Sequence, residues 1–110
     1  MPHCIVEHSS NFEPQPILTA VFQGACESEL FEASDIKVRS SSFEHYQTGN
    51  VQSTFIHIVL KILDGRTIEQ KARLSELVLA KLLELAIDDA SFTVEVVDIE
   101  RASYAKRVRS

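Results

Sequence analysis

The pattern of apolar and polar residues changes twice along this chain from the two-residue period of a strand to the 3.6-residue period of a helix. A strand is predicted over 3–7, and apolar residues then recur at helical spacing from 16 to about 30. A second strand is predicted over 35–40, where Lys37 and Arg39 lie on the face opposite the apolar positions. The first part of the chain therefore reads strand, helix, strand.

The same order of elements returns after a polar segment that contains glycine and asparagine. A long strand rich in β-branched and aromatic residues is predicted over 54–63. Thr67 is a suitable helix N-cap, and Gln70 follows three residues later, as in a capping box. The helix is expected to end at the acidic pair 88–89, and a last strand follows over 91–99. The second part thus repeats strand, helix, strand.

These two halves form an internal repeat within one domain that covers residues 1–110. Repeat one covers 2–43, repeat two covers 54–99, and a polar C-terminal tail covers 100–110. Each unit is expected to have a right-handed crossover and to join two parallel strands. The predicted fold class is therefore α+β, with two βαβ repeats that form a four-stranded mixed sheet and both helices on one face.

The long strand over 54–63 carries apolar residues on both of its sides, with Phe55 and Val59 on one side and Ile56 and Ile58 on the other. Because both helices lie on one face, the other face of the sheet needs a second layer. A second copy of the same chain would supply that layer, so we predict a symmetric oligomer. The alternative is that loops and the tail cover this face.

Composition argues against several classes of function. The net charge of −5 argues against a general nucleic-acid-binding protein. The longest apolar stretch is too short to span a bilayer, and the first residues do not resemble a signal peptide. Cys4 and Cys26 have no metal-binding or redox spacing, and the four histidines are scattered. We therefore expect a cytoplasmic protein with reduced thiols and no bound metal or cofactor.

Pro2 is the most informative single residue, because it follows Met1 and directly precedes the first predicted strand. Removal of Met1 would leave Pro2 with a free secondary amine in place of an amide. An ordinary α-amino group has a pKa of about 7.7–8.0, and nearby cations lower that value. A free Pro2 amine next to positive charge is thus a candidate general base at neutral pH. The alternative is a tolerated second residue on a frayed terminus.

Three cations lie where they could act together with Pro2. Arg66 comes directly before an N-cap, at a helix start whose unpaired N–H groups and dipole favour anions. Lys37 and Arg39 share one face of the second strand, whose start should lie at the same edge of the sheet as the start of the first. Such cations would keep Pro2 neutral and would attract an anionic substrate. For Arg66 the alternative is a solvated pair with the neighbouring Asp64.

The residues at these positions resemble those of a known family. The opening segment 2–7, the block 57–69 around a Gly-Arg turn and the strand 91–96 are similar to those of 5-carboxymethyl-2-hydroxymuconate delta-isomerases, members of the tautomerase superfamily. The resemblance covers nearly the whole chain. It implies a tautomerase-like fold and a homotrimer in which the terminal proline lies in a pocket near the subunit interfaces.

The resemblance also implies roles for single residues. Pro2 matches the proline that acts as base and acid, and Arg66 matches the arginine at the start of the second helix. The family's other arginine falls on Lys37 or, with a two-residue shift, on Arg39. A lysine at that place keeps the charge but loses bidentate carboxylate binding. This chain also has a shorter central loop, without the aromatic-rich segment of typical members.

We therefore expect a cofactor-free isomerase of aromatic catabolism, in which Pro2 shifts a proton along a carboxylated hydroxymuconate-type enol. Its partners would be a small dicarboxylate or tricarboxylate substrate and further copies of the chain in a homotrimer, without nucleic acid or membrane. One alternative is a tautomerase-superfamily enzyme for another enol or keto acid, or a hydratase or dehalogenase. Another is a non-catalytic trimeric anion-binding module, which retention of Met1 would favour.

Overall fold

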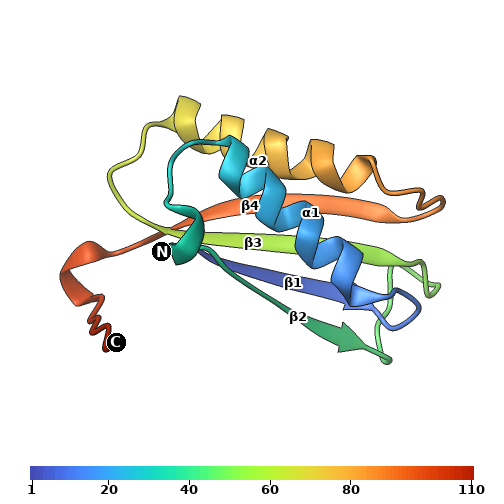
Figure 1. The fold of residues 1–110 in the computed structure, drawn as a ribbon. Helices are drawn as coiled ribbons and strands as arrows, with labels where there is room; N and C mark the ends of the chain where they lie inside the picture. The colour runs from blue at the N-terminus through green and yellow to red at the C-terminus, as the bar shows by residue number, and fades with distance from the viewer.

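Four strands form one sheet, and two helices lie side by side across one of its faces (Figure 1). The computed structural model describes all residues from 1 to 110. In chain order its elements are β1 (His3–Ser9), α1 (Pro14–Glu27), β2 (Lys37–Phe43), β3 (Phe55–Leu63), α2 (Ile68–Leu83) and β4 (Ser91–Ile99), with the short 3-10 helices η1 (Ala33–Asp35) and η2 (Arg101–Ser103). No helix has the length and apolar character that crossing a membrane requires.

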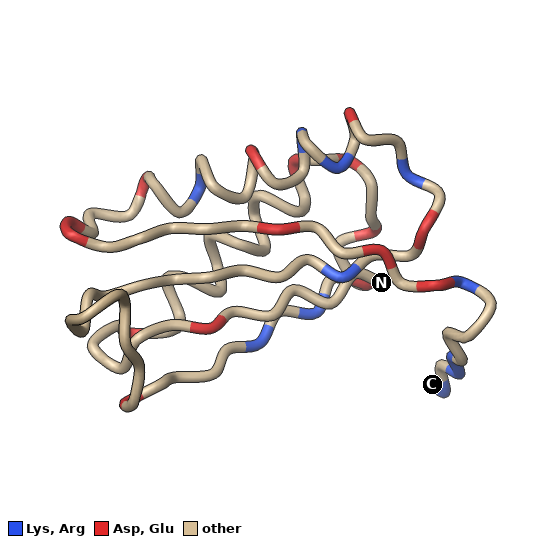
Figure 2. The backbone as a smooth tube through the Cα atoms, turned by 180° about the vertical axis from the view of Figure 1, so that it is seen from behind, with Lys and Arg blue, Asp and Glu red and all other residues tan.

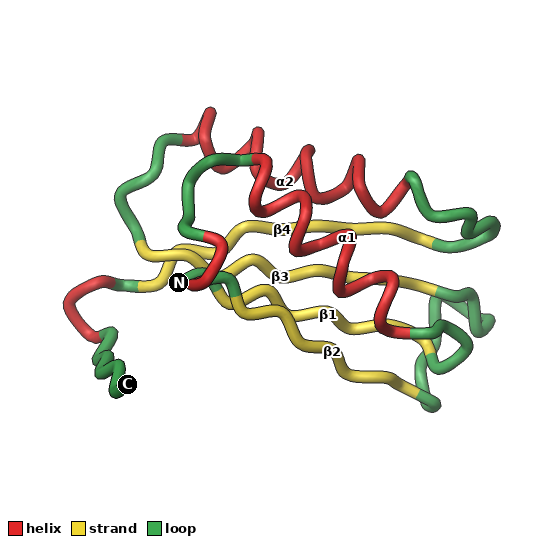
Figure 3. The backbone as a smooth tube through the Cα atoms, in the orientation of Figure 1, coloured by secondary structure: helices red, strands yellow, loops and turns green.

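The order of the strands across the sheet is β2-β1-β3-β4. β1 is parallel to β2 and β3 is parallel to β4, whereas the central pair β1 and β3 is antiparallel. Each parallel pair is connected by one helix, and both helices lie on the same face (Figure 3). The prediction of two βαβ units joined in a mixed four-stranded sheet is thus confirmed.

The core lies between the helices and the covered face of the sheet. It comprises fourteen buried apolar residues, namely Cys4, Val6, Ile17, Ala20, Val21, Ala25, Ile36, Ile56, Ile58, Leu60, Ile62, Leu74, Val78 and Leu82. Those from β1 and β3 occupy every second position, as expected for strands with one face against the helices. The period-two pattern of the sequence therefore sets which side chains enter the core.

Gly24 brings the two helices into close contact. A Cβ atom at this position would lie 2.7 Å from the Cα atom of Val78 on α2. A glycine in a helix interior costs about 1 kcal/mol relative to alanine. Here that cost is offset by the close approach of α1 to α2, which buries Val78 completely.

The predicted boundaries differ from the structure at the ends of several elements. The first helix spans Pro14–Glu27 and not 16 to about 30, and β1 continues to Ser9. The second helix stops at Leu83 and not at the acidic pair 88–89, because Leu85 and Ile87 leave the helical path and pack against the core. β2 begins at Lys37 and not at 35, because η1 occupies the preceding residues. The predicted capping box is present. Gln70 N donates to Thr67 Oγ1 at 3.1 Å, and Thr67 N donates to Gln70 Oε1 at 2.9 Å.

The face of the sheet away from the helices has no second layer in the single chain (Figure 1). Loops and tail cover only its two ends, where Tyr46 contacts Phe55 and Tyr104 contacts His3. Apolar and charged side chains alternate between these ends, so the face is less apolar than the pattern of β3 suggested. We call this surface the open face and define it by Ile5, Glu7, Lys37, Arg39, His57, Val59, Lys61, Glu95 and Val97.

Candidate active site

Pro2 lies directly before β1 and is under 2 % exposed. Its carbonyl oxygen accepts a hydrogen bond from Lys37 N at 3.1 Å, so the pairing of β1 with β2 extends to this residue. The starts of the two parallel strands therefore lie together at one edge of the sheet, as the sequence predicted. Because Pro2 is buried and paired, the alternative of a frayed terminus is wrong.

The pKa of the Met1 terminal amine shows how burial and nearby charges act at this edge of the sheet. It donates to Asp35 O at 3.4 Å. Burial lowers its pKa below the ordinary value of 8.0, and the positive charge of Lys37 lowers it further. Asp35 acts in the opposite direction, and Lys106 lowers the pKa again. An amine at this end of the chain therefore loses its proton more readily than one in water.

A cavity of about 590 Å³ opens beside this terminus. Residues of both the N-terminus and the C-terminal segment line it. The backbone of the C-terminal segment passes the same end of the sheet as the N-terminus, and the lysines and arginines of the strands also lie toward this end (Figure 2). Its walls are formed by Met1, Glu29, Leu30, Phe31, Glu32, Asp35, Ile62, Leu63, Arg66, Arg101, Tyr104 and Lys106. The cavity wall thus combines apolar side chains with charged groups of both signs.

Arg66 lies in the wall of this cavity, directly before the N-cap Thr67 of α2. Its Nη2 atom donates to Leu30 O at 2.8 Å, and its guanidinium lies 5.9 Å from the centre of the Phe31 ring. Both partners are neutral, so the positive charge stays available to an anion. The structure makes no pair between Arg66 and Asp64; Asp64 pairs with Arg101 instead.

Lys37 and Arg39 are not in the cavity wall. Lys37 Nζ donates to Asp35 O at 3.3 Å, close to the start of β1. Arg39 lies two residues farther along β2, where its Nη1 donates to His3 Nδ1 at 3.1 Å. Within one chain both residues therefore lie on the open face, and Lys37 is the closer of the two to Pro2.

His3 connects Arg39 to the C-terminal segment. Because Nδ1 accepts from Arg39, the ring proton is on Nε2, which donates to Tyr104 Oη at 2.9 Å. Burial lowers the pKa of His3 below 6.5, and the charges of Arg39, the terminal amine, Lys37 and Lys61 lower it further. His3 is thus held neutral, in the tautomer that anchors Tyr104.

Two basic residues of the cavity wall were missed by the sequence reading, namely Arg101 and Lys106. They belong to the segment that was described only as a polar tail. Its excess of basic residues was visible, but nothing in the local pattern indicated that the segment returns to the amino-terminal edge of the sheet. The contacts that bring it there, with Asp64 and His3, join residues 37 and 101 positions apart.

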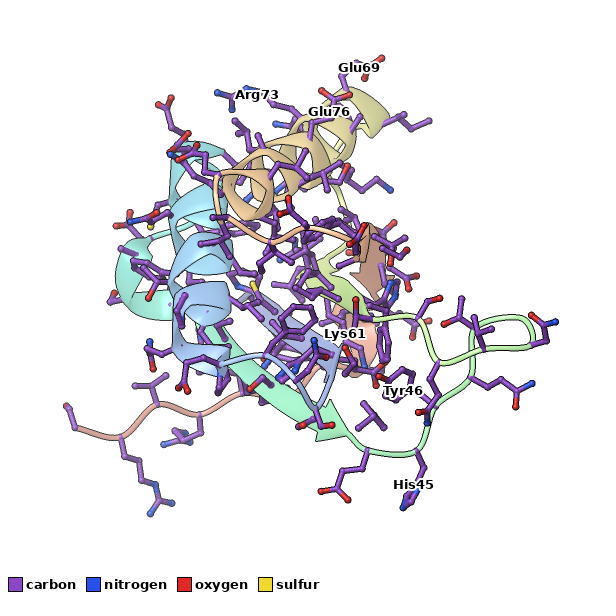
Figure 4. All side chains as sticks on the ribbon, turned by 90° about the vertical axis from the view of Figure 1, so that its right-hand side faces the viewer. His45, Tyr46, Lys61, Glu69, Arg73 and Glu76 are labelled. Carbon is purple, nitrogen blue, oxygen red and sulfur yellow. The ribbon has the colours of Figure 1, made fainter.

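Two other features do not make competing sites. The outer surface of α2 has a shallow hollow lined by Glu69, Arg73 and Glu76, which point away from the sheet (Figure 4), and Arg73 is bound there to the carbonyl of Ser28. Cys4 is buried in the core, and burial raises its pKa to about 12, so its thiol is not reactive. No group of three or more His, Cys, Asp or Glu side chains is arranged to hold a metal ion.

Comparison with solved structures shows that the chain has the tautomerase fold. Pt0534 inactivated by 2-oxo-3-pentynoate is 16% identical with a TM-score of 0.82, over 94% of this chain and 91% of that one. A fused 4-OT described as a symmetric trimer is 18% identical with a TM-score of 0.78, over 94% and 90%. A 5-carboxymethyl-2-hydroxymuconate isomerase from Deinococcus radiodurans R1 is 21% identical with a TM-score of 0.77, over 98% and 90%.

The family assignment comes from the sequence. The model of the 5-carboxymethyl-2-hydroxymuconate isomerase family matches residues 2–106, and the chain belongs to this family. It is therefore an enzyme of the isomerase class. No individual curated protein matches the chain at a significant level.

Proposed function

We propose that this chain, after removal of Met1, is a cofactor-free isomerase that uses Pro2 to move a proton along 5-carboxymethyl-2-hydroxymuconate or a close relative, within aromatic catabolism. The observation that carries this proposal is the place of Pro2. It is buried at the start of β1, directly after Met1, which lines a cavity whose wall also carries Arg66. The pKa of the terminal amine is already lowered at this end of the chain.

The same field supports a neutral Pro2 amine. Loss of Met1 moves the terminal nitrogen by one residue, about 3.8 Å along the chain, from a half-buried position to a buried one. Burial and Lys37 are the two main causes that lower the pKa at Met1, and Pro2 is both more buried and bonded to the backbone of Lys37. A neutral secondary amine has the free electron pair that a general base needs.

The proposed reaction is a proton shift in which substrate and product are isomers. The nitrogen of Pro2 takes the proton of the 2-hydroxyl group, and the electron pair of that bond enters the conjugated chain as a dienolate. Arg66 stabilises the negative charge that develops there. The protonated nitrogen then returns the proton to a carbon farther along the chain, which leaves a 2-oxo group and restores the neutral amine. One base is sufficient because a single bound substrate places both atoms within its reach.

We further propose that the chain assembles as a homotrimer through the open face. This face lacks a second layer, and a structure of similar fold is described as a symmetric trimer. In such an assembly Lys37 and Arg39 would lie at or near an interface, where either side chain could supply the second cation of a cavity.

The decisive variant is Pro2→Ala, because alanine keeps a terminal amine but changes its basicity and its fit. We expect kcat with 5-carboxymethyl-2-hydroxymuconate to fall by about 10²–10⁴-fold, the usual contribution of a positioned general base. Intact mass must show loss of Met1 in both proteins. Unchanged kcat in a variant with verified Met1 removal would rule out the mechanism.

A chemical probe tests the same nitrogen independently. An acetylenic 2-oxo acid such as 2-oxo-3-pentynoate is an electrophile, and Pt0534 is described as inactivated by it. Addition of the neutral Pro2 amine across the triple bond would increase the mass of the N-terminal peptide by one reagent molecule. Modification confined to other peptides would contradict the assignment.

A further inference from the structure

The C-terminal segment places a second guanidinium at the cavity. Arg101 lies in the cavity wall together with Arg66, although 35 residues separate them in sequence. Its Nη2 atom lies 3.9 Å from the position that a Cβ atom on Gly65 would occupy, so the guanidinium is next to the turn that carries Arg66. The two arginines therefore border one end of the same cavity.

We propose that Arg101 is a specificity-determining residue that binds a second carboxylate of the substrate, beyond the carboxylate next to the reacting enol, and so selects polycarboxylates. This inference rests on the proposed function. It assigns a role to a residue of the C-terminal segment that neither the motif around the Gly-Arg turn nor the strand pattern includes.

The contacts of Arg101 fix its position and leave donors free. Its Nη2 donates to Asp64 O at 2.9 Å, its Nε lies 3.5 Å from Asp64 Oδ1, and its backbone N donates to Asp64 Oδ2 at 3.4 Å. A guanidinium has five N–H groups, so these contacts leave both Nη1 hydrogens and one on Nη2 without a partner. That set is suited to bidentate binding of a carboxylate.

The segment that carries Arg101 is anchored on both sides. Asp64 holds the guanidinium of Arg101 at the start of η2, and the hydrogen bond from His3 to Tyr104 holds the chain directly after η2. η2 itself is closed by Tyr104 N, which donates to Arg101 O at 3.3 Å. Arg101 is therefore positioned by the fold, although its side chain is 64% exposed.

The acidic and the basic residues of the cavity wall come from different segments of the chain. The acidic wall residues Glu29, Glu32 and Asp35 all come from the connection between α1 and β2. The cationic ones, Arg66, Arg101 and Lys106, come from the start of α2 and from the C-terminal segment. A substrate carboxylate would be favoured next to the three basic side chains and disfavoured next to the three acidic ones.

The test compares wild type with Arg101→Gln on two enol substrates, the dicarboxylate 2-hydroxymuconate and a monocarboxylate enol such as phenylenolpyruvate. We expect the ratio of kcat/KM for dicarboxylate over monocarboxylate to fall about tenfold, mainly through KM, as loss of a charge-assisted contact at an exposed site predicts. Arg107→Gln, in the same segment but outside the cavity wall, is the matched control and should leave the ratio unchanged. A ratio within twofold of wild type in Arg101→Gln would overturn the proposal.

A binding measurement without turnover tests whether Arg101 binds a second carboxylate, even if the proposed reaction is wrong. Calorimetric titration with propane-1,2,3-tricarboxylate should give about tenfold weaker binding in Arg101→Gln than in wild type, whereas propionate should not distinguish them. If Pro2→Ala kept its activity, the proposed function would be rejected, but the comparison of tricarboxylate affinities would still test the role of Arg101. If Arg101→Gln does not fold, Arg101→Lys keeps the charge and should lose part of the affinity. Equal tricarboxylate affinity in the folded variant and wild type, or no binding by wild type, would reject the role of Arg101.

Discussion

At the scale of single residues, the amino-terminal edge shows how charge and burial act together. Pro2 and Met1 lie where burial disfavours a charged amine, and Lys37 adds repulsion. His3 is kept neutral by the same cations, and its neutral ring binds both Arg39 and Tyr104. Two titratable groups at one edge therefore release their protons at lower pH than they would in water.

A pH profile of the activity tests whether the pKa of the terminal amine is lowered. The pKa of the Pro2 amine should lie below the ordinary 7.7–8.0 of a terminal amine, because burial and cations both disfavour its charged form. Activity should therefore fall as pH decreases through this lowered pKa, and it should already be near its plateau at pH 8. The measurement is kcat/KM against pH, with NMR titration of the proline ring as an independent probe. An inflection at or above pH 8 would contradict the expected field.

At the scale of elements, packing between α1 and α2 decides how the two repeats fit together. The helices contact each other more closely than their side chains alone would allow, because Gly24 has no Cβ to meet the backbone of Val78. Salt bridges at the surface, such as that between Lys81 and Glu27 at 2.8 Å, join the same two helices. Exposed ion pairs contribute little, so the close approach is the more important contact.

Gly24→Ala tests this contact. The substitution improves helix propensity by about 1 kcal/mol, but the new methyl group overlaps a backbone atom that cannot rotate away. We expect a net loss of about 1–3 kcal/mol in the free energy of unfolding, measured by urea denaturation. Gln23→Ala, at the neighbouring exposed position of α1, should change that free energy by less than about 0.5 kcal/mol. Equal or greater stability of Gly24→Ala would show that the helices can move apart freely.

At the scale of the whole molecule, the open face is the one face of the sheet that no second layer covers in the single chain. Its centre combines Ile5 and Val59 with a polar group in which His57 binds Glu95 and Thr93, each at 2.6 Å. Such a mixture is typical of an interface that needs both burial and specific polar pairing. The face opposite, formed by the helices, carries the charged side chains of α2.

The assembly can be tested by light scattering. Wild type should have about three times the 12.3 kDa mass of one chain. Val59→Lys places a charge at the centre of the open face and should shift the mass toward that of a single chain. Ile68→Lys changes an equally apolar residue that is 78% exposed on α2, and it should leave the mass unchanged. A wild-type mass of one chain, or a Val59→Lys protein of unchanged mass, would argue against assembly through this face.

The elements, their order and the two parallel pairs could be predicted from the sequence, because these follow from local periodicity, capping and short connections. The strand over 91–99 and the capping box at Thr67 were predicted correctly for this reason. The set of cations that meet at the cavity became visible only in the folded chain. Arg101 reaches it through contacts with distant residues, whereas Arg39 binds His3 on the open face. Such long-range pairings depend on how whole elements pack, and no local pattern encodes them.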